Sequence, residues 1–114
     1  SDSSGALTYL CQKLRQSDTP GALAVSSLEG CPAIVITQGD ASLYDTYIYC
    51  YDGYLRELMV KRELTPAPSM GRCLVPMEDL QINRWDGLLE LCCTDESGNS
   101  WQRYLYLASL EVSP

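Results

Sequence analysis

The apolar residues near the start of the chain recur at helical spacing. Leu7, Leu10 and Leu14 lie three or four positions apart, and mostly polar side chains fill the positions between and after them. Pro20 keeps the residue before it out of the helical region, so it marks the end of this pattern. The spacing therefore predicts an amphipathic helix over residues 4–17.

After the helix, apolar and polar residues alternate, which is the period of a β-strand. Tight turns are predicted where an acidic residue precedes glycine, at residues 29–30, 52–53 and 86–87. A last strand is expected at residues 101–107. The chain is thus predicted to be a single α+β domain over residues 1–114, in which the N-terminal amphipathic helix packs on a meandering antiparallel β-sheet of about seven short strands.

The segment over residues 62–79 interrupts the alternation. It contains three prolines and a glycine, which are residues that punctuate regular structure. We predict a crossing loop here, with room for one short strand at residues 73–75.

Pairing across the turn at residues 52–53 gathers aromatic side chains on one face of the sheet. Tyrosine offers a large contact area at low entropic cost and is enriched at protein interfaces. We therefore take this face as the candidate interaction surface, with Arg56 able to stack on Tyr49. The alternative is that these residues only stabilise the sheet or lie under the helix, and the pattern does not decide which face is buried. The surface comprises Tyr47, Tyr49, Tyr51, Tyr54 and Arg56.

The net charge and the residue types argue against several classes of function. The formal net charge is −7 and the eight lysines and arginines are scattered, so we expect no direct nucleic-acid binding. The chain has no histidine, which is the usual base for a serine or cysteine nucleophile. No glycine-rich loop between a strand and a helix is present to hold a phosphate. We expect a protein that is not an enzyme, with no cofactor, no catalytic residues, no metal and no small-molecule ligand.

The six cysteines leave two interpretations open. They are spread along the chain at intervals of about twenty residues, whereas zinc sites use paired ligands a few residues apart. Free thiols are favoured, and one or more disulfides are the alternative. Cys92 and Cys93 are adjacent in a predicted strand, so they should point to opposite faces and not bond to each other.

Three stretches of the chain resemble a known protein class. Residues 9–25, YLCQKLRQSDTPGALAV, resemble the segment that follows the transmembrane stretch in minor type IV pilins and pseudopilins. Residues 46–66, TYIYCYDGYLRELMVKRELTP, and residues 75–93, VPMEDLQINRWDGLLELCC, are similar to the body of those proteins. The whole also resembles a Clostridia-type family of short membrane-anchored proteins that look like competence-type minor pilins.

The resemblance implies a location and a role. No segment reaches the ~20 apolar residues that span a bilayer, and the chain begins SDSSG without methionine. We therefore expect that an N-terminal membrane helix has been removed and that the protein lies on the extracytoplasmic face of the cell envelope. The implied role is a non-enzymatic pilin-like subunit of a filament, secretion or competence assembly, whose partners are other pilin-like or envelope proteins. The alternative is a membrane-tethered extracytoplasmic binding module, unrelated to pili, that uses the tyrosine face or residues 62–79.

Overall fold

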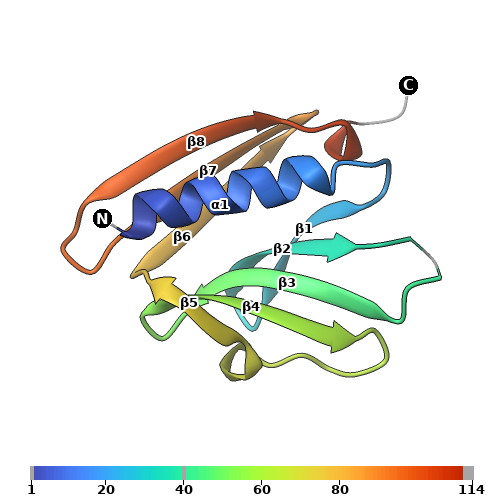
Figure 1. Cartoon of the computed structure of the whole chain (residues 1–114), viewed down its shortest axis with the longest axis horizontal. Helices are drawn as coiled ribbons and strands as arrows, with labels where there is room; N and C mark the ends of the chain where they lie inside the picture. Colours follow the sequence, from blue (N-terminus) through green and yellow to red (C-terminus); the bar gives the residue numbers. More distant parts are fainter. Residues whose placement is uncertain (1, 40, 112–114) are drawn as a thin grey trace.

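A computed structural model of the chain describes residues 2–39 and 41–111 and has an α+β architecture (Figure 1). The N-terminal helix, α1, spans Asp2–Gln16 and agrees with the predicted helix to within two residues at its start and one at its end. As predicted, Leu7, Leu10 and Leu14 are buried, each at 1% exposure or less.

The strands form two antiparallel sheets. The first sheet has the order β1-β2-β3-β4-β5 and the second the order β6-β7-β8. The strands are β1 (Leu23–Leu28), β2 (Cys31–Thr37), β3 (Tyr44–Tyr51), β4 (Tyr54–Lys61), β5 (Arg72–Pro76), β6 (Asp79–Trp85), β7 (Leu88–Thr94) and β8 (Ser100–Tyr106). Two short 3-10 helices complete the fold: η1 (Pro68–Met70) and η2 (Ala108–Leu110).

The prediction of one continuous sheet was wrong, because the chain changes sheets between β5 and β6. The backbone N–H of Met77 donates to the carbonyl of Gly53, in the turn of the first sheet, at 3.0 Å. The next residue, Glu78, donates to Thr94 at the end of the second sheet at 2.8 Å. Met77 itself is 1% exposed, so the crossover is anchored in the core.

The three predicted turns are confirmed, and the two residues in each turn set the register of its hairpin. Leu28 pairs with Cys31 across the first turn, Tyr51 with Tyr54 across the second, and Trp85 with Leu88 across the third. In the second turn Asp52 and Gly53 have φ of 49° and 81°. Positive φ at both central residues is the geometry whose twist matches paired strands, and an Asp-Gly pair adopts it at little cost.

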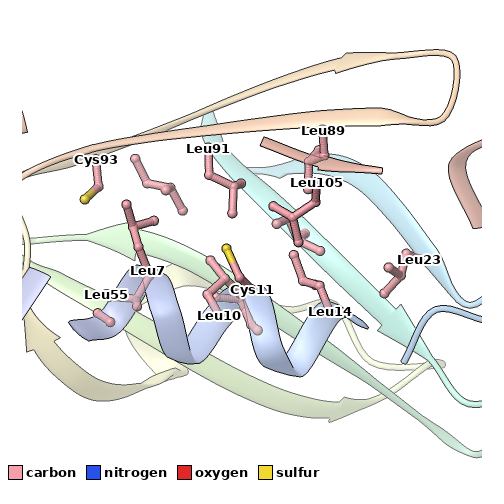
Figure 2. Close-up of a cluster of buried hydrophobic side chains, with 14 of the residues drawn as sticks. Leu7, Leu10, Cys11, Leu14, Leu23, Leu55, Leu89, Leu91, Cys93 and Leu105 are labelled. Atoms are coloured by element: carbon pink, nitrogen blue, oxygen red, sulfur yellow. The ribbon is translucent and has the colours of Figure 1, made fainter. Parts of the chain in front are cut away.

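Helix α1 and the two sheets enclose the main hydrophobic core. Strand β6 lies against β2 and β3, and α1 packs against β5, β7 and β8 (Figure 1). Figure 2 shows Leu7 of α1 pointing towards Cys93, and Cys11 pointing towards Leu91 and Leu105, all in the second sheet. The helix therefore covers both sheets at once, rather than one face of a single sheet.

All six cysteines lie within the described residues and are free thiols, as the sequence favoured. Cys93 is 1% exposed in the main core, while Cys92 is partly exposed on the opposite face of β7. Burial raises the pKa of the Cys11 and Cys93 thiols. Burial and the charge of Asp79 raise the pKa of Cys50 to about 11.

The loop after α1 is tied to η2 at the other end of the chain. The carboxylate oxygens of Asp18 accept hydrogen bonds from the backbone N–H groups of Ala108 and Ser109, each 2.8 Å long. Burial raises the pKa of Asp18, but these two hydrogen bonds outweigh it and hold the pKa below its ordinary value. The tie keeps η2 in place, and Leu110 at its end is 1% exposed in the core.

Replacing Leu10 with alanine should lower the free energy of unfolding by ~2–5 kcal/mol, because the change removes buried methyl groups and leaves a cavity. Chemical denaturation followed by circular dichroism measures this change. The matched control is Gln12→Ala, an exposed position on the same helix, which should change stability by less than about 0.5 kcal/mol. Equal effects of the two substitutions would contradict a helix buried through Leu10.

Replacing Asp18 with asparagine should destabilise the protein at neutral pH by ~0.5–1.5 kcal/mol, because the amide keeps only one acceptor oxygen for the two backbone N–H groups and loses the charge that strengthens both hydrogen bonds. Because the folded pKa of Asp18 is lowered, its contribution is complete above the unfolded pKa and is lost as the pH falls through the folded pKa. The stability difference between the two proteins should therefore begin to shrink as the pH falls below about 5, and it should go on shrinking as the pH falls through the folded pKa, which lies below 3.8. A difference that does not change with pH would show that the charge of Asp18 contributes nothing.

Candidate functional site

The tyrosine hairpin, formed by β3 and β4, has both of its faces buried in part. Ile48 and Leu55 point into the main core below α1. Tyr49 points the other way and belongs to a second, smaller hydrophobic cluster. The buried members of this second cluster are Leu28, Ala33, Tyr49, Leu58 and Val60.

The second cluster is covered by the segment between β4 and β5, residues 62–71, which we call the strap. Tyr49 is 0% exposed beneath it. The Tyr49 hydroxyl donates a hydrogen bond to the carbonyl of Pro68 at 2.6 Å and accepts one from the backbone N–H of Gly71 at 3.1 Å. Burial raises the pKa of Tyr49, an effect that the hydrogen bond from Gly71 partly offsets.

Arg56, which pairs with Tyr49 across the hairpin, also holds the strap. Its Nη1 donates to the carbonyls of Ser69 and Gly71 at 3.4 and 3.3 Å, and its Nε donates to the carbonyl of Tyr51 at 3.0 Å. The guanidinium lies 5.2 Å from the centre of the Tyr51 ring. The prediction that Arg56 stacks on Tyr49 is therefore wrong. Arg56 stacks on Tyr51 instead, because the Tyr49 ring lies under the strap.

The five residues of the candidate interaction surface share one face but differ in exposure. Tyr49 is buried, Tyr47 and Arg56 are partly buried, and Tyr51 and Tyr54 are 37% and 41% exposed. Of these five residues, the tyrosine rings that are exposed to solvent are thus the two at the turn end of the hairpin. The question that the sequence left open is answered: α1 and the second sheet cover one face of the hairpin, and the strap covers the centre of the other.

A second aromatic surface lies on the outer side of the three-stranded sheet, and we call it the outer aromatic face. Trp85, Leu88 and Tyr106 form one row across β6, β7 and β8. Trp85 and Tyr104 are each 53% exposed, and Tyr106 is 84% exposed. Alternation along the last strand already placed Tyr104 and Tyr106 together, but joining them to Trp85 required the pairing of β7 with β8.

A carboxylate is fixed in the next row of this face. Glu90 accepts hydrogen bonds from Tyr104 at 2.7 Å, from Asn83 at 2.9 Å, and from Gln102. The hydrogen bonds from Tyr104 and Asn83 hold the pKa of Glu90 below its ordinary value. Of the aromatic residues on this face, Tyr104 is thus held in place through its hydroxyl.

An apolar groove of about 470 Å³ lies between α1 and β5. Tyr9 is 42% exposed on the helix side, and Leu74 and Val75 are partly buried on the strand side. Sequence reasoning did not identify this groove, because its walls come from two segments about seventy residues apart, whose proximity depends on packing alone. Its walls are Gly5, Ala6 and Tyr9 on the helix and Arg72, Leu74 and Val75 on the strand.

Two classes of site have no representative in the part of the chain that the structure describes. No group of three or more cysteine, aspartate or glutamate side chains there could hold a metal ion. No helix among the same residues is long and apolar enough to cross a membrane.

Gly71→Ala should destabilise the protein by ~1–3 kcal/mol, since a Cβ at residue 71 overlaps the Tyr49 hydroxyl. The backbone at Gly71, with φ of −70°, suits any residue, so the loss would be steric. Gly5→Ala is the matched control: its Cβ meets open space, and a gain of ~0.5–1 kcal/mol is expected in a helix. Urea denaturation of the two variants and of the native protein measures both changes in the free energy of unfolding.

The same clash makes a prediction for a double substitution. Tyr49→Phe removes the hydroxyl that the new Cβ would meet, so Gly71→Ala should cost less in that background than in the native protein. If the destabilisations caused by Tyr49→Phe and Gly71→Ala simply add in the double variant, the new Cβ does not clash with the Tyr49 hydroxyl.

Comparison with known proteins yields one match. No curated protein and no solved structure matches the chain. The model of a family described as a domain of unknown function, DUF4860, matches residues 1–96. The matched region runs from α1 through β7 and therefore includes the tyrosine hairpin, the strap and the groove. The chain belongs to the DUF4860 family.

Proposed function

We propose that this protein is a non-enzymatic, pilin-like subunit of a cell-envelope filament or of a secretion or competence assembly, and that it acts by packing against other subunits. In this proposal an apolar helix precedes α1 and anchors the chain in the membrane. The folded domain then lies on the extracytoplasmic side.

The observation that carries the proposal is the placement of α1. The helix begins near one end of the molecule and runs along the two sheets (Figure 1). It buries Leu7, Leu10 and Leu14 but leaves Thr8 and Gln12 exposed. A helix that packs on a sheet domain through one face, and whose first turn is at the edge of that domain, suits continuation into a longer helix that joins a bundle.

The exposed aromatic residues support a role in protein contacts. Trp85, Tyr104 and Tyr106 lie on the outer aromatic face, and Tyr51 and Tyr54 lie at the turn end of the hairpin. Aromatic side chains are enriched at interfaces because each buries a large area on contact. The two surfaces lie on different sheets, so one subunit could contact two neighbours.

A second candidate function is a membrane-tethered binding module unrelated to pili. The observation that favours it is the apolar groove, since Arg72, Leu74 and Val75 of its wall come from the segment over residues 62–79. The tyrosine face favours it less, because its central ring, Tyr49, bonds to the strap.

The two candidates differ in what should precede α1 in the native protein. The pilin-like proposal predicts a short basic leader, a glycine before the cleavage point and a long apolar helix that continues into Leu7. The test is to read the full-length N-terminus from the gene and to locate the cleavage point by mass spectrometry of the mature protein from the membrane fraction of the native organism. A plain signal anchor followed by a flexible linker would exclude the pilin-like candidate and leave the binding module.

Neighbouring subunits are identified by photo-crosslinking in the same cells. A photoreactive residue at Tyr106, on the outer aromatic face, should give discrete adducts with envelope proteins. The same residue at Glu96, in the exposed loop between β7 and β8, is the matched control. Equal patterns from the two positions would remove the outer aromatic face as an interface.

A further inference from the structure

Strand β5 is the edge strand of the five-stranded sheet and borders the apolar groove. On one side it pairs with β4 from Tyr54 to Glu57, with a register shift between Leu55 and Arg56. Its other side forms the edge of the sheet, and α1 packs alongside (Figure 1). The backbone groups of an edge strand can pair with an added strand from another polypeptide.

The shape of the groove suits a chain that approaches closely. On the helix side, Gly5 and Ala6 have small side chains, and a Cβ at Gly5 would meet nothing within 4 Å. The floor is Leu55, which is 1% exposed, and Leu74 and Val75 are only partly buried. An extended peptide that pairs with β5 would place alternate side chains into this groove and the others towards solvent.

The groove has one charged residue in its wall, Arg72. Its Nη2 bonds to Glu57 Oε1 at 2.9 Å, and its side chain is still 70% exposed. Glu57 is also paired with Lys13 at 2.7 Å, so the three groups together carry a net positive charge. In a chain whose formal net charge is −7, this local positive charge favours a carboxylate of a bound partner.

We propose that the groove between α1 and β5 binds an extended, alternately apolar peptide segment of another protein, which adds a sixth strand to the sheet and places a carboxylate beside Arg72. The carboxylate is either the C-terminus of the peptide or an acidic side chain. A second copy of this chain is disfavoured as the occupant, because two copies of net charge −7 repel each other. This proposal is independent of the pilin-like role, since a groove for a peptide can exist with any native N-terminus.

The probe is a displayed library of peptides about ten residues long with free C-termini, selected against the purified domain. The selected peptides should alternate apolar and polar residues and carry a carboxylate. They should shift the amide resonances of β5 and of the first turns of α1. A peptide synthesised with an amidated C-terminus separates the two sources of the carboxylate: affinity falls if the C-terminus binds, and is unchanged if an acidic side chain binds.

The decisive variant is Gly5→Leu, which should place a side chain in the groove and also favours the helix, so folding should not suffer. It should weaken the selected peptide by about tenfold or more. Thr8→Leu is the matched control, since Thr8 is exposed on the same helix outside the groove wall, and it should leave affinity unchanged.

A second pair of variants tests the charge. Arg72→Gln should weaken the selected peptide about tenfold but have little effect on a version without the carboxylate. Lys13→Gln removes the other partner of Glu57 and leaves Arg72 and Glu57 without a net charge, so it should also weaken the carboxylate-bearing peptide, but by less than Arg72→Gln does. The proposal is overturned if no peptide is selected or if Gly5→Leu binds as well as the native domain. It is equally overturned if the domain self-associates and Gly5→Leu abolishes that association, since the occupant would then be a second copy.

Discussion

The burial of one face of α1 against two separate sheets is the interaction on which the rest of the structure depends. Leu7, Leu10 and Leu14 contribute to a core that draws side chains from both sheets. A three-stranded sheet needs a packed face to be stable, and α1 provides cover for the second sheet and for β5 of the first. The same helix therefore fixes the position of one sheet relative to the other, and it forms one wall of the groove at β5.

The first sheet buries apolar side chains on both of its faces, which explains why neither face of the tyrosine hairpin is wholly polar. Ile48 and Leu55 are buried in the main core, whereas Tyr49 is buried in the second cluster and bonds to the strap. The strap in turn bonds to two side chains of the sheet, Tyr49 and Arg56, through its backbone carbonyl and N–H groups. Such a segment needs no apolar pattern of its own, because side chains from elsewhere satisfy its polar backbone.

Local features were predicted well and long-range ones poorly. The helix, the hairpin turns and their registers follow from residue spacing and from acid-glycine pairs, and the structure confirms them. The division into two sheets could not be predicted, because Met77 and Glu78 bond to residues that are distant in sequence. The burial of Tyr49 could not be predicted either, because its hydroxyl bonds to Pro68 and Gly71 in a loop without periodicity. The groove was missed for the same reason, because α1 and β5 meet only through packing.

The tie from Asp18 to η2 has a consequence for the order of folding. Helix α1 leaves the ribosome before β7, β8 and Leu110, on which its burial depends. A helix of 15 residues is marginal on its own in water. The nascent chain must therefore carry an exposed leucine stripe on α1 until these later elements have been made. The family match ends at residue 96, yet the hydrophobic core extends to Leu110, so a fragment that stops at the match would lose β8 from its core.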